Sequence, residues 1–216
     1  MSEPGASRAG FVLVGGHSSR MGSDKALVEF QGSTLAARIA ECVRSAAGSV
    51  TLVGPPERYR ELGYTVIADR VPNRGPLGGI YTALLASRAE WNLILACDMP
   101  FVTTALLEEL FAVAESGPST ADCVVPESLQ PEGRIESMQQ AGLDAAHVGL
   151  EAAPKAKLDP LCAVYHRRCA HAARHALDRN ILKMHDFIST LRLIKYPVAD
   201  PASLANINSP ADWSRP

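Results

Sequence analysis

Short apolar runs alternate with stretches of helical periodicity along most of this chain, and this alternation limits the fold more than any other feature. We expect strands over 11–14, 50–53, 65–68, 92–96, 122–125, 160–165 and 194–198, and helices over 34–46, 77–88, 103–115, 167–177 and 181–191. Such alternation is typical of a parallel sheet with helices packed on both faces. The 216 residues suffice for one such domain and are too few for two ordinary ones. We therefore predict a single α/β domain over 1–216, with a mostly parallel central sheet.

One stretch departs from this pattern. Residues 127–158 contain few β-branched side chains and many Glu, Gln, Ala, Gly and Pro residues. Segments of this composition seldom bury enough apolar surface to join a core. We expect a long surface excursion here, with room for one short helix.

The overall composition argues against several classes of protein. A formal net charge of −2 gives no reason to expect nucleic-acid binding through a basic face. No apolar run approaches the length of about 18 residues that a membrane span needs, and residues 1–9 lack the apolar core of a signal peptide. The five cysteines are widely spaced and form no C-x-x-C pair, which favours reduced, buried thiols. We expect a soluble cytoplasmic protein with no membrane partner, monomeric or weakly oligomeric.

A glycine-rich loop that ends in a lysine follows the first apolar run. Residues 13–25 read LVGGHSSRMGSDK. Glycines let backbone N–H groups approach an anion closely, and Arg20 and Lys25 add the positive charge that a triphosphate needs. The loop contains neither the dinucleotide fingerprint G-x-G-x-x-G nor the G-K-[ST] ending of the ATPase loop. It is a candidate phosphate-binding site, and a glycine-rich turn without a ligand is the alternative.

The loop resembles the signature L-x-G-G-x-S-x-R-M-G-x-D-K of the molybdenum cofactor guanylyltransferase family. The matching positions are Leu13, Gly15, Gly16, Ser18, Arg20, Met21, Gly22, Asp24 and Lys25, with Val14 where alanine is usual. The resemblance implies a Rossmann-like nucleotidyltransferase that joins GMP from GTP to molybdopterin cofactor, which a cofactor-carrying protein could deliver. It implies a nucleotide-binding part over 9–126 and an acceptor-binding part over 159–213. It also implies nucleotide contacts at Leu13, Val14, Gly15, Gly16 and Lys25, with catalytic roles for Arg20 and Lys25.

Asp98 is the strongest candidate for holding a metal ion. It follows the apolar run 93–96, and ligands of open parallel sheets bind beyond the carboxyl ends of the strands. Mg²⁺ prefers one or two carboxylates, completed by waters and phosphate oxygens. By local sequence alone, Asp98 could instead cap the turn before Pro100. The segment A-C-D-M-P-F is similar to the family's metal-binding C-D-x-P motif, which implies that Asp98 binds Mg²⁺, contacts the nucleotide and takes part in catalysis.

Two further segments match family motifs on the nucleotide side. Asp69 stands at the end of an expected strand, where the family has an aspartate that contacts the nucleotide. A solvated turn aspartate is the other reading. Residues 74–80 match the family's G-P-L-x-G segment, which implies a nucleotide contact at Gly78, while a plain helix start is the alternative. The family often has asparagine where this chain has Gly-Pro-Pro at 54–56, so the base contact there stays unassigned.

The carboxy-terminal part carries candidate acceptor contacts. Residues 206–212 resemble the family's N-x-N-x-P-x-D ending, which implies that Asn206 and Asn208 contact the acceptor and that Asn208 also completes the metal shell. Alternation along an extended segment places both amides on one face. A structural turn is the alternative. The segment 160–165 resembles the family's P-L-x-A-x-Y strand, which implies that it lines the acceptor side.

Two other sets of reactive side chains carry weaker signals. His171 and His175 have i, i+4 spacing on an expected helix and could ligate zinc, but the glutamate of H-E-x-x-H is absent, which favours a solvated helix face. Cys97 precedes Asp98 at a strand end, a position that suits packing, so we assign it no covalent role.

The reaction that the resemblance implies is nucleotidyl transfer. A terminal phosphate of the acceptor attacks the α-phosphorus of GTP and pyrophosphate leaves, which needs charge neutralisation but no strong general base. Two alternatives stay open at this point. One is a cytidylyltransferase or sugar-phosphate nucleotidyltransferase on the same fold. The other is a non-catalytic, regulatory nucleotide-binding module.

Overall fold

The computed structural model describes residues 7–15, 24–130 and 155–207. Its main sheet contains the strands β1 (Arg8–Leu13), β4 (Thr51–Val53), β5 (Thr65–Ile67), β6 (Trp91–Ala96), β7 (Cys123–Gln130), β8 (Lys155–Leu158), β9 (Cys162–His166) and β10 (Leu193–Pro197). Their order across the sheet is β10-β7-β9-β6-β1-β4-β5, and β8 pairs with β7. A separate small hairpin is formed by β2 (Glu29–Phe30) and β3 (Ser33–Thr34).

The main sheet is mostly parallel, as the sequence predicts. Strand β1 pairs in parallel with β4 and β6, β4 with β5, and β7 with β10. Strand β9 runs antiparallel to both of its neighbours, β6 and β7, so those two strands point the same way. The carboxyl ends of β1, β4, β5, β6, β7 and β10 therefore meet at one edge, together with the start of β9.

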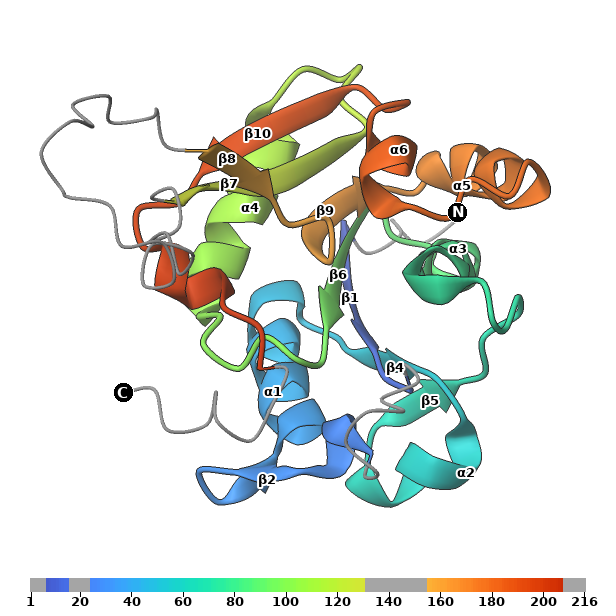
Figure 1. Cartoon of the computed structure of the whole chain (residues 1–216), viewed down its shortest axis with the longest axis vertical. Helices are drawn as coiled ribbons and strands as arrows, with labels where there is room; N and C mark the ends of the chain where they lie inside the picture. Colours follow the sequence, from blue (N-terminus) through green and yellow to red (C-terminus); the bar gives the residue numbers. More distant parts are fainter. Residues whose placement is uncertain (1–6, 16–23, 131–154, 208–216) are drawn as a thin grey trace, which may run out of the picture.

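Helices cover both faces of this sheet (Figure 1). The helices of the described residues are α1 (Leu35–Ala47), α2 (Pro56–Tyr59), α3 (Gly75–Ala86), α4 (Thr104–Ser116), α5 (Cys169–Asp178) and α6 (Met184–Ile188), with the 3₁₀ turns η1 (Lys25–Leu27), η2 (Arg60–Leu62) and η3 (Pro201–Leu204). Helices α1 and α4 pack on one face, and α3, α5 and α6 pack on the other. None of the helices described here is long and apolar enough to cross a membrane.

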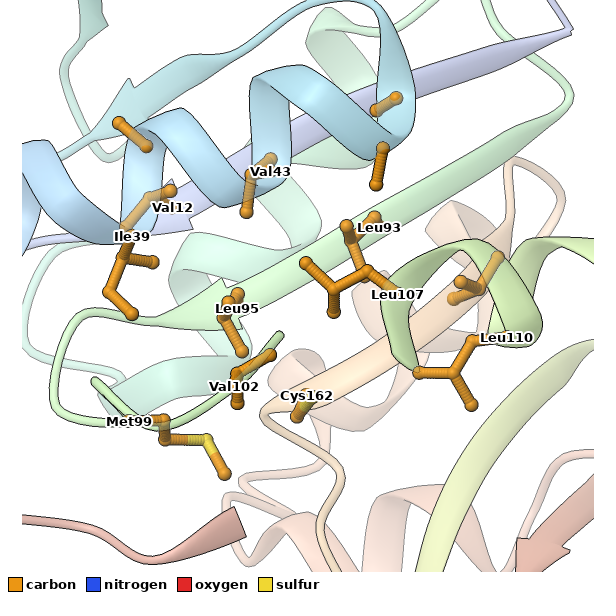
Figure 2. Close-up of a cluster of buried hydrophobic side chains, with 14 of the residues drawn as sticks. Val12, Ile39, Val43, Leu93, Leu95, Met99, Val102, Leu107, Leu110 and Cys162 are labelled. Atoms are coloured by element: carbon orange, nitrogen blue, oxygen red, sulfur yellow. The ribbon is translucent and has the colours of Figure 1, made fainter. Parts of the chain in front are cut away.

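Two apolar layers form the core, one on each face of the sheet. Alternating residues of β1 and β6 point to opposite sides, because successive side chains of a strand do so. Phe11 and Ile94 join the layer under α3 and α5, whereas Val12 and Leu95 join the layer under α1 and α4. Figure 2 shows the second layer, in which the strand residues meet aliphatic side chains of α1 and α4.

Local signals in the sequence explain where the long helices begin and end. Thr34 accepts a hydrogen bond from the N–H of Ala37 and so caps α1, and Gly48 ends that helix in a left-handed conformation with φ of 74°. Thr103 caps α4 in the same way, through the N–H of Leu106. These helices match the expected ones to within one residue at each end.

The surface excursion expected over 127–158 is wrong at both of its ends. Strand β7 continues through Glu127 to Gln130, and β8 pairs with it antiparallel, with Glu127 opposite Leu158. Polar residues at an edge hairpin satisfy their backbone groups through the ladder, although their composition resembles a loop. The middle of the excursion, 131–154, and any short helix there lie outside the described residues.

Other departures concern short elements. The helix expected over 181–191 shrinks to the five residues of α6. The β2–β3 hairpin was not expected; its turn contains Gln31 and Gly32, both with positive φ. Helix α2 was also missed, although Pro56 at its first position is a helix-start signal.

Close packing of β1 against α1 leads to a prediction at Gly10. A Cβ atom there would lie 2.3 Å from Cγ1 of Val43 and 2.6 Å from the carbonyl oxygen of Ser49. We expect Gly10→Ala to lower the free energy of unfolding by about 2–3 kcal/mol, since overpacked cores force backbone shifts. Urea unfolding measures this loss.

The control is Gly63→Ala. Gly63 has a positive φ of 79° and open space around its Cα, so alanine there adds backbone strain alone. That strain costs about 1 kcal/mol. If Gly10→Ala is no less stable than Gly63→Ala, the packing of β1 against α1 differs from that described here.

Candidate active site at the carboxyl edge of the sheet

The candidate residues of the nucleotide side lie where parallel strands end. Leu13 stands opposite both Ala96 and Val53, and Val53 stands opposite Ile67. The segments that follow β1, β5 and β6 therefore begin at the same level of the sheet. This register brings Gly15, Asp69 and Asp98 to one edge. The N–H of Cys97 also donates to the carbonyl of Leu13 across 3.3 Å, which ties the last residues of β1 to the Asp98 segment.

Lys25 and Asp98 form an ion pair at this edge. Nζ of Lys25 lies 3.2 Å from Oδ2 of Asp98, and the two side chains are only 15% and 22% exposed. Lys25 is the first residue of η1, whose turn is capped by the carboxylate of Asp24. The structure thus brings together two residues that are 73 positions apart and that the sequence assigned to phosphate and metal binding.

The segment after η3 contacts the same aspartate. Nδ2 of Asn206 donates to Oδ1 of Asp98 across 3.4 Å, and the N–H of Ile207 donates to the backbone carbonyl of Asp98 across 2.9 Å. Ile207 is fully buried in a small cluster with Phe30 and Leu35. Asn206 thus lies beside Asp98 although the two are 108 residues apart in sequence, and its predicted contact with the acceptor stays a prediction.

This donor set suits a hard divalent cation. Oδ1 of Asn206 is fully buried without a hydrogen-bond partner, and the same side chain lies against the Asp98 carboxylate. A buried amide oxygen without a partner costs free energy, and a cation ligated by carboxylate and amide oxygens would remove that cost. No cluster of three His, Cys, Asp or Glu side chains exists among residues 7–15, 24–130 and 155–207. A divalent cation that takes few protein ligands, as Mg²⁺ does, would share substrate phosphate oxygens there.

The residues between β1 and the loop are held by the sheet. The N–H of Val14 donates to the carbonyl of Val53 across 2.9 Å, and the Val14 side chain is buried. The Leu13 side chain packs against Gly79, where a Cβ would lie 2.9 Å from Cδ2 of Leu13. Gly15 has φ of 95°, a left-handed conformation that favours glycine. Contacts of Leu13, Val14 and Gly15 with a nucleotide stay predictions.

Asp69 is tied to the start of α3. Its Oδ1 accepts from the N–H of Val71 at 2.9 Å and from the Thr82 hydroxyl at 2.8 Å. A Cβ at Gly78 would lie 3.0 Å from Oδ2 of Asp69, so the glycine leaves room for this carboxylate. Asp69 and Gly78 are thus neighbours, as a shared site requires. A direct contact of either residue with the nucleotide stays a prediction.

The segment 160–165, which we expect to line the acceptor side, begins at the same edge of the sheet. The N–H of Ala96 donates to the carbonyl of Leu161 across 2.8 Å, which places the start of β9 beside the end of β6. The start of the expected strand over 160–165 therefore lies beside Ala96, two residues before Asp98.

Cys97, His171 and His175 carried the weaker signals for covalent and zinc chemistry. Burial and the neighbouring charge of Asp98 raise the pKa of the Cys97 thiol to about 12, so that it stays protonated and is a poor nucleophile at neutral pH. This agrees with the sequence analysis, which assigns Cys97 no covalent role. His171 and His175 are exposed on α5, as a solvated helix face requires.

Three predicted residues, Gly16, Arg20 and Asn208, lie outside the described residues, so the structure does not place them. One residue beside the site was missed. The hydroxyl of Tyr59 in α2 donates to Oδ2 of Asp24 across 2.7 Å. Its sequence neighbours Glu57, Arg58 and Arg60 are charged, and this polar context concealed a buried tyrosine.

The chain is similar to several known proteins. The profile of the "MobA-like NTP transferase domain" family matches residues 10–192. A "Probable molybdenum cofactor guanylyltransferase" of Flavobacterium johnsoniae is 31% identical over 92% of this chain and 90% of its own length. The crystal structure of molybdopterin-guanine dinucleotide biosynthesis protein A from Archaeoglobus fulgidus superposes with a TM-score of 0.70 at 24% identity, over 95% of this chain and 94% of its own.

The fold alone is shared more widely. The 2-C-methyl-D-erythritol 4-phosphate cytidylyltransferase from Thermus thermophilus superposes with a TM-score of 0.65 at 16% identity, over 94% of each chain. Fold likeness at this level of identity does not separate one nucleotide preference from another.

The Lys25–Asp98 ion pair generates a prediction about metal affinity. The ammonium group competes with a cation for the same carboxylate, so Lys25→Met should tighten binding of free Mn²⁺ without nucleotide. We expect affinity to rise about two- to fivefold, equal to about 0.4–1 kcal/mol, the upper range for a partly exposed pair. Electron paramagnetic resonance of free Mn²⁺ measures this affinity.

The matched control is Lys195→Met, which removes an ion pair with Glu127 of 3.0 Å on the surface. It should leave Mn²⁺ binding unchanged. Equal or weaker Mn²⁺ binding by Lys25→Met would show that the cation does not use the Asp98 carboxylate.

Proposed function

The chain belongs to the family of MobA-like NTP transferase domains, and on that premise we propose that it transfers GMP from GTP to molybdopterin cofactor. The terminal phosphate of the cofactor attacks the α-phosphorus of GTP, pyrophosphate leaves, and the product is the guanine dinucleotide form of the cofactor. The observation that carries this proposal is the convergence of Lys25, Asp98 and Asn206 at the carboxyl edge of a parallel sheet. An anionic phosphate and a divalent cation would both find partners there.

Positively charged side chains and backbone N–H groups of the chain would bind the phosphates of the nucleotide. Lys25, already within 3.2 Å of Asp98, would turn to the phosphates of GTP as they enter and neutralise charge that develops in the transition state. Arg20 would add a second cation, and backbone N–H groups from Gly15 and Gly16 would bind phosphate oxygens. Asp69 and Gly78, which lie side by side at the start of α3, would contact the nucleoside.

Asp98 and the asparagines would hold Mg²⁺. The carboxylate of Asp98 and the amide oxygens of Asn206 and Asn208 are the ligands that the chain offers. When bound, Mg²⁺ neutralises and orients phosphate oxygens. The attacking phosphate is already an anion, so the chain needs no strong general base. The protonated Cys97 thiol beside Asp98 does not compete as a nucleophile.

The acceptor would bind beside the start of β9 and the Asn206 segment. Both lie close to Asp98, so a phosphate bound there would be near a nucleotide held on the Lys25 side. A cofactor-carrying protein could deliver the molybdopterin. Cytoplasmic location and a monomeric or weakly oligomeric state stay predictions.

A panel of nucleotides tests this function directly. Purified protein is incubated with Mg²⁺, molybdopterin cofactor and GTP, CTP, ATP or UTP in turn, and pyrophosphate release is measured. We expect kcat/KM for GTP to exceed that for CTP by about tenfold or more, equal to about 1.4 kcal/mol. A preference for CTP would indicate a cytidylyltransferase. Nucleotide binding without pyrophosphate release from any of the four would indicate a non-catalytic module.

Substitution of Asp98 tests the chemistry at the centre of the site. Asp98→Asn keeps the shape and removes the charge, so we expect a folded protein whose kcat falls by about two orders of magnitude, the usual scale for one charge-stabilising group. The control, Asp186→Asn, changes an exposed aspartate of α6 and should leave turnover intact. Near-normal turnover of Asp98→Asn with an unchanged melting temperature would exclude the proposed role.

A further inference from the structure

Tyr59 lies against both described ends of the glycine-rich loop. At one end, a Cβ on Gly15 would lie 2.8 Å from Cδ of Pro55 and 3.6 Å from the hydroxyl oxygen of Tyr59. At the other end, the same hydroxyl donates to Oδ2 of Asp24 across 2.7 Å. One buried side chain of α2 therefore lies near Gly15 and hydrogen-bonds Asp24, the residues that precede and follow the loop segment 16–23.

The ring of Tyr59 is fixed by the core. The residue is completely buried and belongs to the apolar layer under α1 and α4. Burial and the adjacent Asp24 carboxylate hold the pKa of Tyr59 far above the ordinary value of a tyrosine. The hydroxyl consequently keeps its proton at every physiological pH and always donates to Asp24.

Asp24 connects Tyr59 to the turn that contains Lys25. Its Oδ1 accepts from the N–H of Ala26 at 3.1 Å and caps η1, while Oδ2 accepts from Tyr59. Nη1 of Arg58 approaches the same oxygen only to 3.8 Å, so the tyrosine provides its short contact. Lys25 begins η1 and reaches Asp98. A continuous line of contacts thus runs from Tyr59 through Asp24 and η1 to the ion pair.

We infer that Tyr59 is a positioning residue for nucleotidyl transfer: its hydroxyl holds Asp24 so that η1 presents Lys25 to Asp98 and to the phosphates. This inference rests on the proposed function for its catalytic consequence, whereas the effect on the position of Lys25 is independent of any substrate. Tyr59 itself touches no reacting atom. It acts through Asp24, because a three-residue turn has too few hydrogen bonds to fix its own place.

Tyr59→Phe removes the hydroxyl and keeps the buried ring, so it isolates this contact. The first measurement uses no ligand: competitive amine labelling followed by mass spectrometry compares Lys25 with the surface residue Lys195. We expect labelling of Lys25 to rise several-fold in Tyr59→Phe. The second measurement is turnover of GTP, where we expect kcat to fall about tenfold with KM changed little, as for an interaction made mainly in the transition state.

Tyr64→Phe is the matched control. The Tyr64 hydroxyl also donates to a carboxylate, Glu41 of α1, away from the ion pair. This variant should match the wild type in Lys25 labelling and in kcat. The inference would be overturned if Tyr59→Phe kept wild-type Lys25 labelling and wild-type kcat, whatever its melting temperature.

A second variant covers the case in which Tyr59→Phe does not fold. Asp24→Ala breaks the same line of contacts one step nearer to Lys25, and it should raise Lys25 labelling as well. Where both single variants fold, the double variant should be no worse than Asp24→Ala alone, since the shared contact is lost only once. Additive losses would overturn the inference. If the wild-type protein turns over no nucleotide, the proposed function is refuted. If Lys25 labelling nevertheless rises in Tyr59→Phe, the positioning role of Tyr59 still holds.

Discussion

The site depends on the parallel pairing of β1 with β6. Six consecutive residue pairs, from Arg8 with Trp91 to Leu13 with Ala96, end both strands at the same level. Because side chains alternate along a strand, a slip of one residue would turn Val12 out of one apolar layer and into the other. A slip would also put Ala9 or Phe11 in place of Gly10, where α1 leaves no room for a Cβ, so close packing fixes the register. The same register determines that the glycine-rich loop and Asp98 begin side by side, so the apolar core sets the geometry of a polar site.

The polar contacts at this edge add little stability, and their arrangement is better explained by ligand binding. A partly exposed ion pair such as Lys25–Asp98 contributes about 0–1 kcal/mol. Asn206 adds a weak hydrogen bond of 3.4 Å and leaves its own oxygen buried without a partner. An unpartnered buried amide oxygen destabilises the folded chain. A chain that was shaped for stability alone would place apolar groups here. A cation and an anionic substrate would satisfy the groups that the folded protein leaves incompletely paired.

The sequence predicted those parts of the fold that local signals determine. The apolar periodicity over 34–46 predicted α1 to within one residue at each end, and the carboxylate that follows an apolar run made Asp98 a candidate metal ligand. The direction of β9 cannot be predicted from its own residues, because antiparallel and parallel buried strands have similar compositions. The polar residues 127–130 of β7 read as a loop since their pairing with β8 depends on distant residues. Tyr59 was missed for the same reason: its partner, Asp24, is 35 residues away.

The position of Lys25 shows how contacts from other parts of the chain hold a short element in place. The three residues of η1 form no stable helix by themselves, since helix nucleation is unfavourable at that length. Four contacts fix it from outside: the cap from Asp24, the burial of Ala26, the hydrogen bond from the N–H of Leu35 to the carbonyl of Val28, and the Lys25–Asp98 pair. Three of these depend on the chain's own packing and persist without substrate. Only the fourth involves the charged groups that a nucleotide and a cation would rearrange. The turn can therefore stay in place while the ammonium group exchanges one anionic partner for another. The proposed role of Lys25 in neutralising phosphate charge requires this combination of a fixed backbone and a mobile side-chain end.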